Sequence, residues 1–140
     1  MRVSKYATAY QKGISLVDNA KVHINKRIIL KLDIKDFFPV FYLLISVCII
    51  MNYHKEHQPA YISNLILRSC DEEVGKYCDN LNISYTRYFD DLIFSGDFNP
   101  NDLIVIVRNL LKKYHFKLNY DKIRVLNSSK RPSSFIKYNN

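Results

Sequence analysis

The sequence predicts an α/β fold in which one small domain is built on a split βαβ, or ferredoxin-like, core. Three observations predict it: a β-branched segment at residues 27–34, a helical repeat of apolar residues at 62–81, and strand-forming residues around an Asp-Asp pair within 83–96. A second helix and a final strand complete the order strand, helix, strand, strand, helix, strand. The central strands of this pattern are neighbours, so the end of the first strand and the Asp-Asp turn are expected to lie together.

The first three elements are predicted by the spacing of their apolar residues. Residues 27–34 read RIILKLDI, which favours a buried strand, and Pro39 is expected to stop it. Residues 62–81 carry an apolar side chain every three or four positions, which predicts one continuous helix. Residues 83–96 read ISYTRYFDDLIFSG, which predicts a hairpin with the two acids near its turn.

The last elements are predicted by capping residues and β propensity. Asn99 and Pro100 supply an N-cap and a first-turn proline for a second amphipathic helix. Residues 117–126 then predict one or two short strands. Residues 127–140 are polar and are expected to be loose.

Composition limits the partners and the compartment. The 140 residues, 48% of them hydrophobic, suit one domain with a buried core. The formal net charge of +8 favours a polyanion such as nucleic acid, although an ordinary basic soluble domain would carry the same charge. Cys48, Cys70 and Cys78 form no CxxC pair and are interpreted as reduced, buried thiols of a cytoplasmic protein.

The most apolar stretch reads VFYLLISVCIIM at residues 40–51. It is too short to span a bilayer, which takes about 20 apolar residues. A buried helix or strand is therefore the default interpretation, and a membrane-touching segment is a minor alternative. Residues 1–13 are too polar for a signal peptide, and no membrane partner is predicted. The same run is uncharged and β-prone, which predicts marginal stability and self-association.

Three carboxylates, those of Asp33, Asp90 and Asp91, are the candidate catalytic and metal-binding groups. Clustered carboxylates repel one another unless a cation neutralises them, and hard oxygen ligands select Mg²⁺ or Mn²⁺. Two such ions can activate a 3′-hydroxyl and stabilise a leaving pyrophosphate, which suits nucleotidyl transfer. For an Asp-Asp pair taken alone, the plainer interpretation is an ordinary turn.

The flanking residues favour the functional interpretation through a family resemblance. Residues 88–91 read YFDD, which resembles the YxDD box of reverse transcriptases, and the wider run 85–96 is similar to the retron and group II intron version, where Ala usually follows the Tyr. Residues 32–39, LDIKDFFP, resemble the first catalytic motif of that family. Residues 19–23, NAKVH, match the NAxxH signature of retron enzymes. Together, and in the order in which they follow one another along the chain, the motifs identify a resemblance to retron-type bacterial reverse transcriptases, in a truncated and divergent copy.

This resemblance implies a polymerase palm and assigns roles to the matching residues. Asp33 and Asp90 would hold both metal ions, with Asp91 in a supporting role. Four more residues are implied to contact the nucleotide or the primer: Asp36 beside the incoming triphosphate, Phe38 under the sugar, Tyr88 near the primer end, and Lys122 placed to protonate pyrophosphate. Without the family motif, Phe38 would be a plain core residue and Lys122 a solvated lysine.

The resemblance also predicts the domain organisation. Residues 1–26 are interpreted as a remnant of the fingers with the retron NAxxH region, residues 27–126 as the palm, and residues 127–140 as a loose, truncated tail. The fingers would then be largely missing and the thumb absent. The QGxxxSP motif of the family has no match in HQPAYISN at residues 57–64, although the ISN that follows it is kept.

Two classes of function remain. The first is an RNA-directed DNA polymerase that uses Mg²⁺, an RNA template, a DNA primer strand and dNTPs, with a structured retron RNA, in a bacterial antiviral defence system. The alternative is a catalytically idle palm fragment that binds RNA, or a decayed remnant. The intact carboxylates favour the enzyme, whereas the missing fingers, thumb and Gln-Gly pair favour the alternatives.

Overall fold

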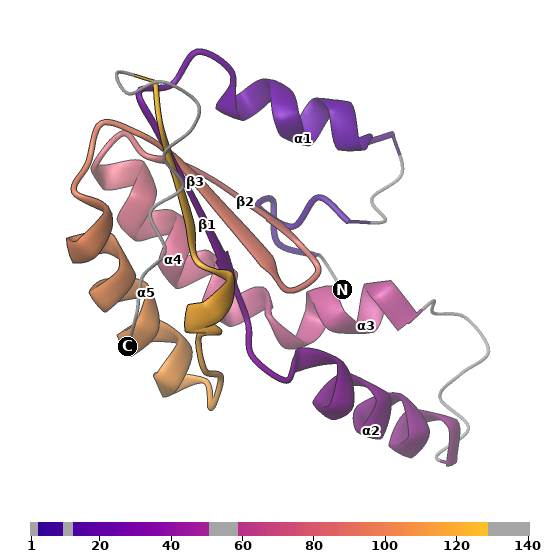
Figure 1. The fold of residues 1–140 in the computed structure, drawn as a ribbon. Helices are drawn as coiled ribbons and strands as arrows, with labels where there is room; N and C mark the ends of the chain where they lie inside the picture. Colours follow the sequence, from indigo (N-terminus) through magenta and orange to yellow (C-terminus); the bar gives the residue numbers. More distant parts are fainter. Residues whose placement is uncertain (1–2, 10–12, 51–58, 129–140) are drawn as a thin grey trace.

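The computed structural model of the chain describes residues 3–9, 13–50 and 59–128 (Figure 1). It is a mixed α/β structure, as predicted. In chain order its elements are α1 (Leu16–His23), β1 (Ile28–Asp33), α2 (Phe37–Ile50), α3 (Pro59–Ile66), α4 (Arg68–Asn80), β2 (Ser84–Tyr88), β3 (Asp91–Gly96), α5 (Pro100–Lys113), the 3₁₀ turn η2 (Tyr120–Lys122) and β4 (Arg124–Asn127).

The four strands form one antiparallel sheet in the order β2-β3-β1-β4. β1 is central: it pairs with β3 on one side and with β4 on the other. The predicted hairpin is present as β2 and β3, with Tyr88 opposite Asp91 across its turn. The end of β1 reaches the same turn because Asp33 lies opposite Asp91 in the β1–β3 ladder.

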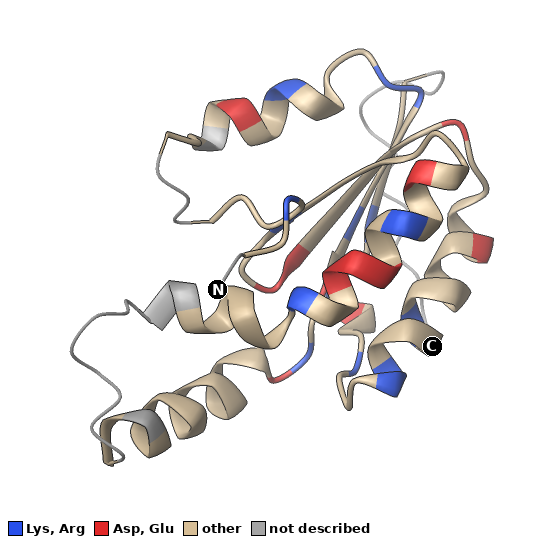
Figure 2. Ribbon diagram, turned by 180° about the vertical axis from the view of Figure 1, so that it is seen from behind, with Lys and Arg blue, Asp and Glu red and all other residues tan. Residues whose placement is uncertain are grey.

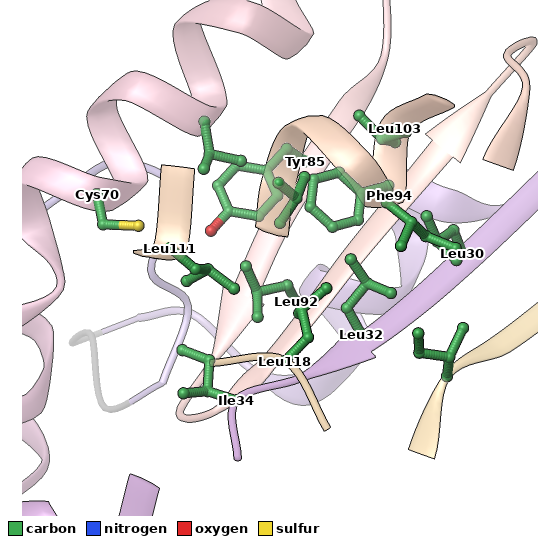
Figure 3. Close-up of a cluster of buried hydrophobic side chains, with 14 of the residues drawn as sticks. Leu30, Leu32, Ile34, Cys70, Tyr85, Leu92, Phe94, Leu103, Leu111 and Leu118 are labelled. Atoms are coloured by element: carbon green, nitrogen blue, oxygen red, sulfur yellow. The ribbon is translucent and has the colours of Figure 1, made fainter. Parts of the chain in front are cut away.

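One face of the sheet carries the hydrophobic core, and α4 and α5 cover that face (Figures 1 and 3). Side chains that alternate along the strands point into it, since period two places every second residue on one face. α5 begins at the predicted cap, where the Asn99 side chain accepts a hydrogen bond from the Asn101 amide. The fully buried apolar side chains from strands and helices include Leu30, Leu32, Val74, Leu92, Phe94, Val107 and Leu111.

The opposite face is covered at one end by α1. His23, the last residue of α1, lies within 2.6 Å of the Ser95 hydroxyl through Nδ1 and within 2.7 Å of the Thr86 hydroxyl through Nε2. Burial, with a smaller contribution from Lys26, lowers the pKa of His23 to about 4. His23 is therefore neutral at pH 7 and connects α1 to both strands of the hairpin.

The N-terminal segment, residues 3–9, lies along the free edge of β2. The Arg87 amide donates to the Tyr6 carbonyl at 2.8 Å, and the Thr8 amide donates to the Arg87 carbonyl at 2.8 Å. The Tyr6 ring packs directly over Gly75 of α4, where a Cβ atom would lie 2.1 Å from the ring. The segment thus protects the edge of the sheet and contacts a helix on the core side.

The expectation of one continuous helix over residues 62–81 was wrong. Two helices, α3 and α4, meet at Leu67, whose ψ of −3° interrupts the regular helix. Leu67 is still buried against the core, so the apolar repeat continues through the break and cannot reveal it. The region also begins earlier than predicted, because α3 starts at Pro59.

Residues 40–50 fall within α2, and the expectation that this stretch is buried was wrong for most of it. Only one stripe of α2, made of Phe37, Phe41 and Ile45, reaches the core. Leu43 is 65% exposed and Ile50 is 80% exposed, because no described element packs on the outer side of the helix. α2 carries no charged residue, as Figure 2 shows.

Pro39 does not stop the first strand. β1 has already ended at Asp33, and Pro39 lies in the first turn of α2, where its missing N–H removes no helical hydrogen bond. Among the described residues, none of the helices is long and apolar enough to cross a membrane. The mismatched residues 57–58 and the tail at 129–140 lie outside the described residues.

Cys70 and Cys78 are buried, as predicted. Cys70 and Cys78 are free thiols on the inner side of α4, and burial raises the pKa of each to about 12. Such thiols stay protonated at neutral pH and are unreactive.

Candidate active site

The three predicted carboxylates form one cluster. One oxygen each from Asp33, Asp90 and Asp91 can be chosen so that all three lie within 4.8 Å of one another. Asp33 ends β1, Asp91 begins β3, and Asp90 lies in the hairpin turn between β2 and β3. The turn appears in red in Figure 2. The prediction that these side chains meet across the sheet is confirmed.

The backbone explains why Asp90 faces Asp33. Phe89, which precedes it, adopts a left-handed conformation with φ of 55°, and this closes the hairpin tightly. The Ile34 amide then donates to the Asp90 carbonyl at 3.0 Å, which attaches the turn to the end of β1. The turn and the end of β1 are therefore held together by main-chain atoms, independently of the acidic side chains.

Two lysines neutralise part of the acidic charge. Asp33 is only 3% exposed, and its carboxylate accepts hydrogen bonds from Asn119 Nδ2 and Lys122 Nζ, both at 3.1 Å. Lys31, two residues before Asp33 and therefore on the same face of β1, lies 2.9 Å from the Asp91 carboxylate. The hydrogen bond and charge of Asp33 raise the pKa of Lys122. Lys122 is therefore protonated at neutral pH.

No lysine is paired with Asp90 in the same direct way within the described residues. Burial and the nearby charges of Asp33 and Asp91 raise the pKa of Asp90. An additional cation next to Asp90 would relieve this repulsion. The donor set consists of carboxylate oxygens, without nitrogen or sulfur ligands among the described residues, so it fits Mg²⁺ or Mn²⁺ rather than zinc.

An open pocket of about 450 Å³ adjoins the carboxylates. Phe38, from the first turn of α2, is 43% exposed and forms an apolar wall of this pocket. Its ring centroid lies 6.3 Å from that of Phe89 in the hairpin turn. The residues that line the pocket are Lys31, Asp33, Phe38, Asp90, Asp91, Lys122 and Arg124.

Two implied nucleotide contacts are not among these lining residues. Asp36 is exposed and adopts φ of 54° in the connection between β1 and α2. Tyr88 is half-buried, with its ring edge-on to Phe89 at 5.6 Å. The pocket therefore brings Phe38 and Lys122 to the acids, while Asp36 and Tyr88 lie outside its wall.

Sequence reasoning missed two basic residues of the pocket, Lys31 and Arg124. The signal for Lys31 was its position two residues before Asp33, because alternate residues of a strand share a face. Arg124 lies opposite Lys31 in the β1–β4 ladder. It could have been found only by predicting the register of β4, which nothing in the sequence specifies.

Comparison with known proteins adds the decisive observation. No protein-family model matches the chain. It is 30% identical over 76% of its length to the retron Ec83 reverse transcriptase of Escherichia coli, and 28% identical over 88% to the retron Mx65 reverse transcriptase of Myxococcus xanthus. The chain is a divergent retron reverse transcriptase-like protein. A further relative, the retron Ec86 reverse transcriptase of Escherichia coli, is 29% identical over 66% of the chain.

The retron reverse transcriptase-like chain spans less than half the length of these curated relatives. The aligned part covers 43% of the Ec83 protein, 38% of the Mx65 protein and 36% of the Ec86 protein. The similarity therefore concerns a part of those proteins.

Proposed function

We propose that the chain is the palm of an RNA-directed DNA polymerase of the retron type, with a ferredoxin-like split βαβ core. The observation that carries the proposal is the carboxylate cluster at the turn of the hairpin, with one protonated lysine beside it. The sheet order β2-β3-β1-β4 supports the core assignment, because a split βαβ pattern places the first and third strands side by side. Within this proposal, residues 27–126 form the palm, and residues 1–26 belong to the fingers with the retron NAxxH region.

The proposed reaction joins the 3′-oxygen of a primer to the α-phosphorus of a dNTP, with the hydroxyl proton released to solvent water, and breaks the bond to pyrophosphate. Bound Mg²⁺ or Mn²⁺ would lower the pKa of the 3′-hydroxyl and neutralise charge on the phosphates. Asp33 and Asp90 would hold the ions, and Asp91 would complete the acidic set. Lys122 would give a proton to the leaving pyrophosphate, since its charged amine already lies at the pocket.

The walls of the pocket suggest how the nucleotide would be held. Phe38 presents an exposed ring, which suits contact with a sugar and exclusion of a 2′-hydroxyl. Asp36 would place its backbone near the triphosphate, and Tyr88 would lie near the primer end. Because Asp36 and Tyr88 are not among the residues that line the pocket, they would contact parts of the substrate that extend beyond it.

The proposed partners are an RNA template, a DNA primer strand, dNTPs and a structured retron RNA. The proposed setting is antiviral defence in the bacterial cytoplasm. The excess of basic residues supports affinity for nucleic acid. The exposed, uncharged side of α2 supports self-association, because apolar patches of this kind promote contact between copies.

Incorporation of a labelled dNTP on an RNA template with a DNA primer tests this function. The unchanged chain is expected to extend the primer with Mg²⁺ or Mn²⁺ and not with EDTA, and Asp90→Asn is expected to lose the activity. Asp102→Asn, on the exposed first turn of α5, is the matched control with the same change of charge. Salt-dependent RNA binding without extension by the unchanged chain would instead select an idle RNA-binding palm.

A further inference from the structure

A buried ion pair lies directly behind the carboxylate turn. The Arg87 side chain of β2 and the Asp71 side chain of α4 are 1% and 2% exposed. Arg87 Nε and Nη2 each donate to the Asp71 carboxylate at 2.8 Å, and the Tyr85 hydroxyl donates to the same carboxylate at 2.8 Å. Hydrogen bonding to Asp71 outweighs the effect of burial and raises the pKa of Arg87. The Arg87 side chain is therefore charged, and its bonds to Asp71 hold it in one orientation.

The rest of the guanidinium is directed at the turn itself. Arg87 Nη1 donates to the Phe89 carbonyl at 2.7 Å, and Nη2 also donates to Asn64 Oδ1 at 3.1 Å. The Phe89 carbonyl belongs to the peptide that leads into Asp90. The carboxylate of Asp71 holds one side of the planar guanidinium, and the other side therefore fixes the orientation of the peptide between Phe89 and Asp90.

Phe89 needs such a constraint. A non-glycine residue with φ of 55° is uncommon, and for a bulky side chain the conformation persists only when its surroundings enforce it. The hydrogen bond from Arg87 is one enforcing contact, and the hydrogen bond from the Ile34 amide to the Asp90 carbonyl is another. If the turn relaxed, Asp90 would rotate away from Asp33.

We propose that Arg87 is a positioning residue that holds Asp90 in the geometry for metal binding by fixing the left-handed conformation of Phe89. The inference rests on the proposed function, because it takes the carboxylate cluster as the metal site. It also gives a reason for a buried ion pair, which seldom stabilises a fold more than apolar residues of the same size would. Arg87 touches neither substrate nor metal in this role.

The test is the affinity for Mn²⁺, measured by electron paramagnetic resonance on the purified full chain. Arg87→Lys keeps the charge but cannot form the fork, and its dissociation constant for Mn²⁺ is expected to rise about tenfold or more, as for other residues that orient metal ligands. Asn64→Ala is the control, since it removes a contact to the same guanidinium without touching the bond to Phe89. Its affinity for Mn²⁺ is expected to stay within a factor of about two of the unchanged chain, well below that tenfold effect.

Two further variants keep the test decisive if Arg87→Lys does not fold. Phe89→Pro excludes a positive φ while it leaves the Arg87–Asp71 pair in place, so it is expected to weaken Mn²⁺ binding as strongly. Phe89→Gly in the Arg87→Lys background tolerates the left-handed turn and is expected to restore part of the affinity. A merely structural role of Arg87 would not give this rescue.

The outcomes separate the two proposals. If the unchanged chain does not bind Mn²⁺, the metal site of the proposed function fails. If the unchanged chain binds Mn²⁺, and folded Arg87→Lys or Phe89→Pro binds it equally well, the positioning role of Arg87 is overturned. The positioning role is supported if Arg87→Lys and Phe89→Pro both bind Mn²⁺ more weakly. In that case Phe89→Gly should also restore part of the affinity in the Arg87→Lys background, and Asn64→Ala should bind Mn²⁺ as the unchanged chain does.

Discussion

Asp90→Asn is expected to stabilise the metal-free chain and to reduce strongly its stabilisation by Mn²⁺. Burial, together with the nearby charges of Asp33 and Asp91, raises the pKa of Asp90, so the native state binds a proton at Asp90 more readily than the unfolded state does. The free energy of unfolding therefore falls as the pH rises from the ordinary Asp value of 3.8 through the native value. At pH 7 the ionised carboxylate of Asp90 therefore lowers the free energy of unfolding by its full amount. The neutral amide of Asn would remove this destabilisation.

The size of this cost follows from the distances. Two unit charges separated by 4.8 Å, the upper limit within the cluster, repel by about 3.5 kcal/mol at an effective dielectric constant of about 20, and by about 0.9 kcal/mol in water. Lys122 and Lys31 offset part of the repulsion through Asp33 and Asp91. We therefore expect Asp90→Asn to raise the free energy of unfolding by about 1 kcal/mol, a melting point higher by roughly 3–5 °C.

Thermal unfolding followed by circular dichroism, in EDTA and in Mn²⁺, checks both parts. Mn²⁺ at about ten times its dissociation constant should stabilise the unchanged chain by about 1.4 kcal/mol, and Asp90→Asn by much less. The control is Asp102→Asn, which alters the net charge equally on an exposed turn and should change neither value beyond about 0.5 kcal/mol. An Asp90→Asn chain that is less stable in EDTA, yet gains as much from Mn²⁺, would refute the reasoning.

Three other perturbations have defined outcomes. Gly75→Ala should destabilise the chain by about 1–3 kcal/mol, measured by urea unfolding, because the new methyl group displaces the Tyr6 ring. Burial lowers the pKa of His23 to about 4, so the stability that its neutral form provides is complete above pH 6.5 and is lost as the pH falls toward 4. In His23→Gln the free energy of unfolding should therefore lose about 3 kcal/mol less over this pH range than in the unchanged chain. In sedimentation at low micromolar concentration, the unchanged chain should self-associate through α2, and Leu43→Glu with Ile50→Glu should be monomeric.

Matched controls belong to each of these measurements. Lys76→Ala lies next to Gly75 but on the exposed side of α4, and should leave stability nearly unchanged. His115→Gln removes an exposed histidine and should leave the acid profile as it is. Val105→Glu puts a charge on the exposed side of α5 and should not prevent self-association. A control that behaves like its partner variant would count against the corresponding prediction. An unchanged chain that is monomeric would count against self-association through α2.

The strands and the meeting of the acids could be predicted because they depend on local patterns. A β-branched segment, an Asp-Asp pair between strand formers and a capped helix each specify an element, and the order of elements specifies which strands are neighbours. Asp33 and Asp90 therefore came together as expected. The family resemblance assigned Phe38 and Lys122 to the same site, and both side chains line the pocket beside the carboxylates; their roles there stay predictions.

Other features depend on tertiary contacts that leave no periodic signal. The break at Leu67 occurs within an unbroken apolar repeat, and the exposure of α2 follows from the lack of a covering element among the described residues. The pair of Arg87 and Asp71 joins a strand to a helix, and in the sequence each residue reads as an ordinary surface charge. Only the packing of α4 on β2 shows that both are buried.

The central position of β1 has a consequence for how the chain reaches its native state. β1 is synthesised before both of its neighbours, β3 and β4. Its apolar residues, including Leu30 and Leu32, must therefore remain without strand partners until the hairpin forms, and closing such long loops slows folding. The repulsion among the three carboxylates arises only when β3 docks on β1. Formation of the site and completion of the sheet should thus be one late event, which divalent ions would favour.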